Sequence, residues 1–301
     1  MTTSRKLRLF LAGLLLIGLL PLCAGATHQQ SGWDYIRSDH FDYYYKADRD
    51  PFPERVPIAL ERLEWFYDTV APLWDYPENI RITYYRYPSR EDLTAATGRD
   101  VNGFAVLNRA TVHTISLADA HEVAHLFTTQ KLFCLFNNCS LSTFWMEGIA
   151  MYYTWPLVYY CELHNTIHQC HIGTWYGKTI HCYSRDLLLK GELMAIGPCI
   201  YGNDHFETVG YRCSYPAAGS FITFLLGPGQ SNPEQIEKMK AFFQHINFAR
   251  SHEEVADAFN EIFGSTIEEV EADWHKFLKD WCSCQMEQYC NCGITPSCPA
   301  P

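Results

Sequence analysis

The chain lacks several features that would place it among disordered or nucleic-acid-binding proteins. Only 19% of its residues are charged, while 15% are aromatic and 48% hydrophobic, which is not the composition of a disordered polypeptide. Its 23 Lys and Arg residues are outnumbered by 34 Asp and Glu residues, so we expect no nucleic-acid partner. It has no internal repeat and no low-complexity stretch. A folded chain of 301 residues remains, long enough for one large domain or two small ones.

Long apolar runs are also absent, except for one near the N-terminus. The run Leu9–Leu22 follows three basic residues within Arg5–Arg8 and precedes the A-x-A cleavage pattern at Ala24–Ala26. Because a comfortable membrane span needs about 20 apolar residues, residues 1–26 are interpreted as a secretory signal peptide. We expect an exported protein, secreted or periplasmic, with no stable membrane span after cleavage. A signal anchor or a lipoprotein at Cys23 is the alternative.

Cysteine, by contrast, is abundant. Removal of residues 1–26 leaves 12 of the 13 cysteines and lowers the formal net charge from −11 to −14. An even number in an exported chain predicts disulfide bonds. Seven of the 12 lie between Cys134 and Cys213 and five follow Trp281, so complete pairing requires at least one bridge from the tail to the central region.

The hydrophobic pattern predicts an α+β fold in several segments. After the signal peptide, residues 27–155 form an N-terminal α/β subdomain, and residues 184–281 a helical C-terminal subdomain. Between them, residues 156–183 are interpreted as a Cys/His-rich insertion, and residues 282–301 as a Cys-rich tail. Within the first subdomain we expect strands over 41–45 and 80–87, helices over 57–71 and from Ser89 to Gly98, a hairpin over 103–115, and helices over 117–130 and 143–153.

The segment His121–His125 reads H-E-V-A-H. On a helix, residues four apart share one face, so both imidazoles can reach one Zn²⁺ ion, and Glu122 lies beside it as a general base for a polarised water. The sequence therefore predicts one zinc per chain.

A catalytic zinc needs a third protein ligand. Residues 126–146 contain no His, Asp or Glu, which excludes the H-E-x-x-H-x-x-G-x-x-H pattern of metzincins. The first candidate is Glu147, a carboxylate within an apolar run. The rivals lie in the insertion: Glu162, His164, His168 and His171. Those three histidines could also hold a second metal, although the neighbouring cysteines favour a disulfide-bonded loop.

H-E-x-x-H followed by Trp145–Tyr152, which reads W-x-E-G-x-A-x-Y, resembles the gluzincin zinc metallopeptidases of the peptidase MA-like group. Softer similarities extend over most of the mature chain. The resemblance implies a zincin-like fold with a thermolysin-type core: a small N-terminal mixed sheet, active-site helices and a helical C-terminal subdomain. One difference is Met151, where thermolysin-like enzymes often have an acidic residue that supports the zinc ligands.

The resemblance implies hydrolysis of peptide bonds in a peptide or protein substrate. His121, His125 and Glu147 would hold the zinc, and Glu122 would take a proton from the attacking water and pass it to the leaving amine. An oxyanion donor is also expected: Tyr215 is the first choice, then Tyr211 and His205. The hairpin over 103–115 would bind an extended substrate by strand addition.

Two other functions stay open. One is a catalytically silent binding module that keeps the fold, against which the intact Glu122 argues. The other is an amidase that acts on cell-wall peptide with the same zinc geometry. The sequence does not indicate the oligomeric state.

Overall fold

The computed structural model describes residues 32–130, 142–154, 179–202, 204–227, 232–247, 249 and 251–281. Three of the predicted features lie outside these ranges: the signal peptide, residues 156–178 of the insertion with its metal candidates, and the Cys-rich tail. No helix of the described ranges combines the length and the apolar character that crossing a membrane requires.

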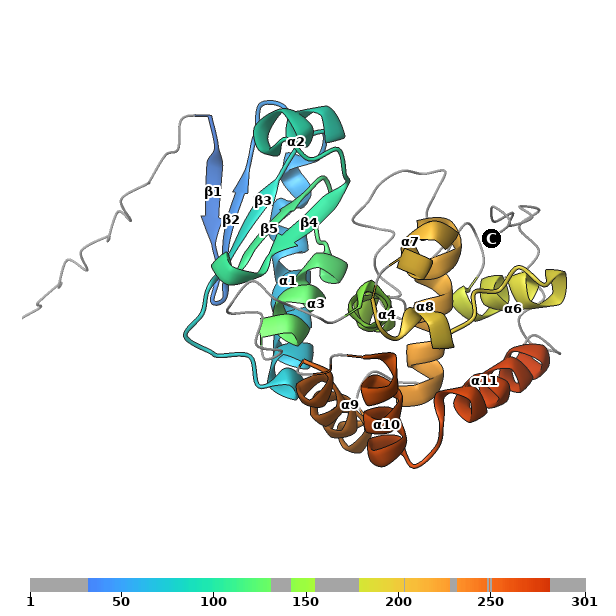
Figure 1. Cartoon of the computed structure of the whole chain (residues 1–301). Coiled ribbons are helices and arrows are strands. Elements are labelled where there is room, and N and C mark those ends of the chain that lie inside the picture. The colour runs from blue at the N-terminus through green and yellow to red at the C-terminus, as the bar shows by residue number, and fades with distance from the viewer. Residues whose placement is uncertain are drawn as a thin grey trace, which may run out of the picture.

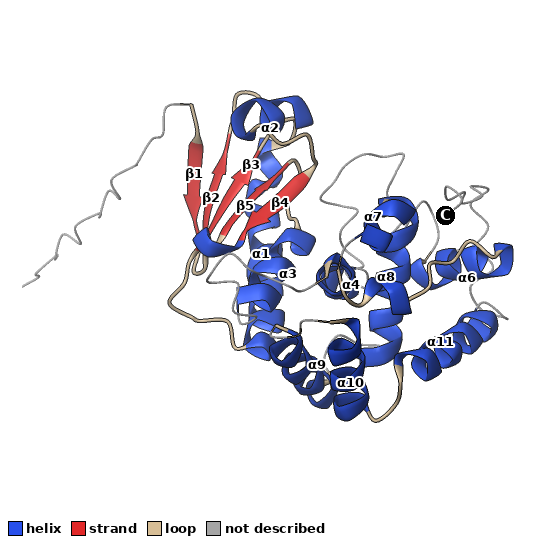
Figure 2. Ribbon diagram, in the orientation of Figure 1, coloured by secondary structure: helices blue, strands red, loops and turns tan. Residues whose placement is uncertain are grey.

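The N-terminal half of the described chain contains a five-stranded mixed sheet (Figure 2). Its order is β1-β2-β3-β5-β4, with parallel pairing of β2 with β3 and of β3 with β5, and antiparallel pairing at both edges. The strands are β1 (Asp34–Arg37), β2 (Phe41–Tyr45), β3 (Ile82–Arg86), β4 (Gly103–Val106) and β5 (Thr111–Thr114). The strands and the hairpin expected from the sequence are confirmed, whereas β1 has no counterpart among the expected strands.

The two faces of the sheet differ because side chains alternate along each strand. One face is buried under α1 (Val56–Val70) and α3 (Ala120–Gln130), which lie side by side behind the sheet in Figure 1. The other face carries a row of five rings whose neighbouring centroids are 4.9 to 5.0 Å apart, which is about the spacing of the strands themselves. From β1 to β4 the row consists of Tyr35, Tyr44, Tyr85, His113 and Phe104.

The helix that links β3 to β4 has both ends that the sequence predicts. Helix α2 (Arg90–Thr97) begins after Ser89, whose Oγ accepts a hydrogen bond from the Asp92 N–H at 3.1 Å. It ends at Gly98, whose φ of +76° lies in the left-handed region. Glycine adopts this conformation readily because it has no side chain. Helix α1 likewise matches the predicted amphipathic helix within one residue at each end.

The rest of the described chain is helical, as the sequence predicts. Helices α4 (Thr143–Thr154) and α8 (Tyr211–Leu226) lie at its centre, next to α6 (Ile180–Lys190) and α7 (Asp204–Val209) (Figure 1). The remaining elements are α9 (Pro233–Ile246), α10 (His252–Phe263), α11 (Ile267–Trp281) and short 3-10 turns at Pro53–Arg55, Ala71–Trp74, Leu107–Arg109 and Gly197–Cys199.

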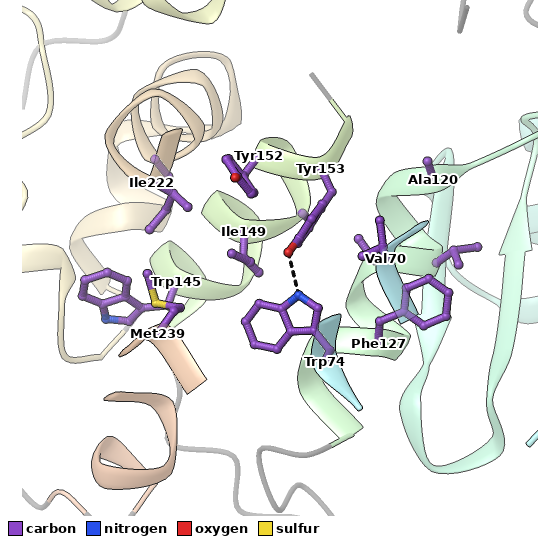
Figure 3. Packing of buried hydrophobic residues seen from close by; sticks show 14 of the residues in the cluster. Val70, Trp74, Ala120, Phe127, Trp145, Ile149, Tyr152, Tyr153, Ile222 and Met239 are labelled. Carbon is purple, nitrogen blue, oxygen red and sulfur yellow. Dashed lines mark hydrogen bonds between the residues drawn. The ribbon is translucent and has the colours of Figure 1, made fainter. Parts of the chain in front are cut away.

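Helix α4 is buried between the two halves of the molecule (Figure 3). Toward the sheet side, the Tyr153 hydroxyl oxygen accepts a hydrogen bond of 2.7 Å from the Trp74 indole N–H. Toward α8, two glycines allow close packing: a Cβ on Gly148 would lie 2.7 Å from Ile222 Cγ1, and one on Gly219 would lie 2.6 Å from Met151 Cβ. Met151 is therefore part of the contact between α4 and α8.

A buried polar cluster connects α6, α8 and α11. The Ser220 hydroxyl oxygen accepts a hydrogen bond of 3.0 Å from the Trp274 indole N–H and lies 2.8 Å from His181 Nδ1. His181 is 2% exposed, and burial lowers the pKa of its imidazole to about 3. The histidine is therefore neutral in the folded chain, and its Nδ1 shares a hydrogen bond with the Ser220 hydroxyl.

The cysteines correct one expectation. Cys182 and Cys213 are disulfide-bonded, but Cys199 is a free, buried thiol. Burial, and then the charge of Glu271, raises the pKa of the Cys199 thiol to about 12. Without Cys199, six cysteines remain in the central region, so the count no longer requires a bridge to the tail.

Candidate metal centre

Helix α3 carries the H-E-x-x-H residues at its first two turns. Its apolar face, formed by Val123, Ala124 and Phe127, is fully buried. This anchors the helix and leaves His121 and His125 on the same side, with their ring centroids 4.8 Å apart. The order of apolar and titratable residues in the motif thus determines which face of α3 is buried and which face carries the two imidazoles.

Helix α4 brings Glu147 between the two imidazoles. Its Oε2 lies 2.9 Å from His121 Nε2 and 3.5 Å from His125 Nε2. All three side chains are nearly enclosed, with exposed fractions of 16%, 12% and 13% for His121, His125 and Glu147. Within the described ranges, these residues form a group whose ligand atoms lie within 4.8 Å of one another.

The donor set fits a tetrahedral zinc ion. Ligand atoms about 2.1 Å from a tetrahedral ion are about 3.4 Å from one another. The two separations of 2.9 and 3.5 Å therefore need only small side-chain adjustments to surround an ion. Two imidazole nitrogens and one carboxylate oxygen are also a common ligand set of catalytic zinc, which keeps a fourth position open.

Electrostatic interactions within the group are strong. Burial opposes the charged form of His121, yet the hydrogen bond and charge of Glu147 raise the pKa of His121 to about 9. Burial likewise opposes the charged form of Glu147, but His125 and His121 hold its pKa far below the ordinary range. The three side chains therefore attract a cation, and a bound metal ion must displace a proton.

Glu122 faces a different environment from the proposed ligands. Burial, followed by the charge of Asp119, raises the pKa of Glu122 to about 7, although both histidines act in the opposite direction. A carboxyl group with a pKa near neutrality can both accept and return a proton.

Asp119 is a residue of this site that the sequence analysis missed. Its Oδ1 accepts a hydrogen bond of 3.3 Å from the Glu122 N–H, and its Oδ2 accepts one of 2.6 Å from Thr114 Oγ1. Asp119 therefore caps α3 and ties its first turn to β5. The spacing Asp119-x-x-Glu122 is similar to a capping box, and this signal could have revealed the residue.

The structure brings Tyr215, the first choice for an oxyanion donor, to the group. Its ring is stacked on His121 at 6.1 Å. Burial, then the charge of Glu147 and a hydrogen bond to it, raises the pKa of Tyr215 far above its ordinary value. Tyr211 is 56% exposed at the start of α8, with the Arg212 guanidinium over its ring, and His205 lies on α7.

The hairpin predicted to bind substrate has an open edge beside α3. Strand β4 ends the sheet, and no other described strand pairs with it on the far side. The Ile115 N–H donates to the Asn102 carbonyl oxygen at 2.9 Å, and bonded pairs alternate in an antiparallel ladder. Gly103 and Ala105 therefore direct their N–H and C=O groups toward the open edge.

No known protein-family model matches this sequence, and no curated protein is significantly similar to it.

Proposed function

We propose that this chain is an exported zinc-dependent metallopeptidase with a thermolysin-type, gluzincin core. The observation that carries the proposal is the convergence of His121, His125 and Glu147, which come from two separate helices, with Glu122 beside them. An α+β chain with a small mixed sheet and a helical remainder is compatible with this core.

His121, His125 and Glu147 would hold the zinc ion. When bound, zinc supplies Lewis-acid polarisation of a water molecule and of the scissile carbonyl. Both histidines stabilise the charged form of Glu147, whose Oε2 lies 2.9 Å from His121 Nε2. Their enclosure limits exchange with solvent, which favours a permanently bound ion over a transient one.

Glu122 acts as the proton carrier. Its pKa, raised to about 7, allows the carboxylate to accept a proton from water and the carboxylic acid to return it to the leaving amine. Tyr215 remains protonated at any physiological pH because its pKa is raised, so its hydroxyl can donate a hydrogen bond to the developing oxyanion.

The substrate is a polypeptide in extended conformation. The outward-facing N–H and C=O groups of Gly103 and Ala105 can pair with its main chain, as an added strand of the sheet. This interaction selects no side chain, so it suits cleavage at varied sequences. Cell-wall peptides, the substrate of the amidase alternative, are accommodated less well because short branched peptides offer little extended main chain.

The test compares four purified proteins: wild type, Glu122→Gln, Glu147→Ala and Glu253→Gln. Glu253 is the matched control, because both glutamates lie in the first turn of a helix, Glu122 in α3 and Glu253 in α10. Unlike Glu122, Glu253 is exposed and lies outside the candidate site. Each protein is analysed for bound metal by mass spectrometry and incubated with a diverse peptide library.

Wild type and Glu253→Gln should each hold one zinc and cleave peptides. Glu122→Gln should keep zinc and lose at least about a hundredfold in rate, the usual contribution of a general base. Glu147→Ala should lose most of its zinc. A folded wild-type protein that binds no zinc would refute the proposal, and undiminished cleavage by Glu122→Gln would refute the role of Glu122. Zinc binding without any cleavage would support the silent binding module.

A further inference from the structure

Gly103, the first residue of β4, lies directly over the first turn of α3. A Cβ at this position would be 2.9 Å from Asp119 Oδ2, 3.1 Å from Thr114 Oγ1 and 3.2 Å from Glu122 Cγ. Alanine therefore cannot replace Gly103 unless at least one of these side chains moves.

The three neighbouring side chains belong to one connected group. Thr114 Oγ1 donates to Asp119 Oδ2, and Asp119 Oδ1 accepts from the Glu122 N–H. The Asp119 N–H also donates a hydrogen bond of 2.8 Å to the Tyr84 hydroxyl oxygen, which fixes the main chain of Asp119 to β3. Asp119 is only 8% exposed, so it has little room to retreat from an added methyl group. The displacement would thus be passed to the Glu122 side chain.

We propose that Gly103 is a positioning residue for the general base. Because it has no side chain, the Thr114–Asp119 pair can hold the start of α3, and the Glu122 side chain can lie close under the open edge of β4. The inference rests on the proposed role of Glu122. It adds that the same residue both offers main-chain groups to the substrate and sets the distance between the substrate strand and the carboxylate.

The other closely packed glycines have a different surrounding. Gly148 and Gly219 face aliphatic side chains between α4 and α8, where an added methyl group would disturb core packing. Gly197 has no heavy atom within 4 Å of its Cβ position and no positive φ, so it tolerates alanine. Gly197→Ala is therefore the matched control for Gly103→Ala.

The experiment measures kcat and KM for peptide cleavage, bound zinc, and amide hydrogen exchange of the Glu122 N–H by NMR in the metal-free protein. Compared with Gly197→Ala, the Gly103→Ala variant should retain one zinc, because the ligand side chains are not displaced. Its kcat should fall by about tenfold or more, because a misplaced catalytic group costs rate even at small displacement. Its KM should change by less than about threefold, and the Glu122 amide should exchange faster, because its cap is disturbed.

A second variant provides a rescue. Thr114→Ala removes the oxygen that lies 3.1 Å from the Cβ position and gives Asp119 space to move aside. If the clash is the cause, Gly103→Ala with Thr114→Ala should have a higher kcat than Gly103→Ala alone, although each single change lowers it. Such non-additivity is the signature of two residues that share one space.

Three results would overturn the inference. In the first, Gly103→Ala equals Gly197→Ala in kcat and in Glu122 amide exchange. In the second, the rate falls only in proportion to lost zinc, as for a purely structural role. In the third, the rescue variant shows strictly additive losses. If the wild type cleaves no peptide, the proposed function fails, and amide exchange still decides whether Gly103 holds the first turn of α3 in place.

Discussion

The buried histidine of α6 makes the stability of this protein sensitive to acid. His181 stays neutral in the folded chain, where burial lowers its pKa to about 3, whereas a histidine in the unfolded chain has a pKa of about 6.5. Between these two values the unfolded state binds the proton and the folded state does not. The stability that the neutral histidine contributes is therefore present above the unfolded pKa of about 6.5. It is lost progressively as the pH falls from about 6.5 toward 3.

The magnitude follows from the two pKa values. At pH 7 the unfolded histidine is mostly neutral, and the loss is only about 0.2 kcal/mol. At pH 5 it is almost fully protonated, and the loss from this residue reaches about 2 kcal/mol, with a limiting slope of about 1.4 kcal/mol per pH unit.

The variant His181→Asn isolates this effect. Asparagine can place an oxygen near the position of Nδ1, within reach of Ser220, but it does not titrate. Its smaller volume lowers stability by a constant amount at every pH. Other titrating groups, including the candidate metal ligands, contribute equally to both proteins.

The assay is urea unfolding of both proteins in the presence of a chelator, at several pH values from 7 to 5. We expect the difference in unfolding free energy between wild type and His181→Asn to shrink by about 2 kcal/mol over this range. Parallel stability curves would show that His181 is not held neutral in the folded protein, and would refute the reasoning.

Three further outcomes follow from the packing. Tyr153→Phe leaves the buried Trp74 N–H without its acceptor and should cost about 1–3 kcal/mol in urea unfolding, with zinc content unchanged; a stability equal to wild type would contradict the contact. Gly219→Ala inserts a methyl group against Met151 and should destabilise by about 1–3 kcal/mol, whereas a gain in stability would mean that α4 and α8 are less closely packed. Cys199 should resist iodoacetamide at pH 7 and react fully in denaturant, as read by peptide mass spectrometry; labelling of the native protein at the rate of a free thiol would contradict its burial.

Much of the local structure could be predicted from the sequence because its signals are local. The capping pattern at Ser89 and the glycine at position 98 define both ends of α2. The apolar spacing of 57–71 likewise predicts α1. H-E-x-x-H places two imidazoles on one helix face, and the lone carboxylate of an apolar helix indicates Glu147, which the structure places between them.

The remainder depends on contacts between distant segments. The parallel pairing of β3 with β5 has no local signal, and neither has the approach of Gly103 to Asp119. Counting cysteines gave a wrong expectation because parity cannot show that a buried thiol such as Cys199 packs as an apolar side chain. The choice of Tyr215 among many tyrosines rested on resemblance, and only the fold shows which tyrosine lies against His121.

The contact between α4 and α8 has a consequence for how this sequence can diverge. Gly148 accommodates Ile222, and Gly219 accommodates Met151, so each glycine on one helix is matched by a larger residue on the other. A larger side chain at Gly148 requires a smaller residue in place of Ile222, and one at Gly219 requires glycine in place of Met151, because the close contact there is with the Met151 Cβ itself. Homologous sequences should therefore show correlated substitutions at these two pairs. Such covariation would preserve the distance between α4 and α8, and with it the position of the Glu147 carboxylate relative to Tyr215, while exposed residues change freely.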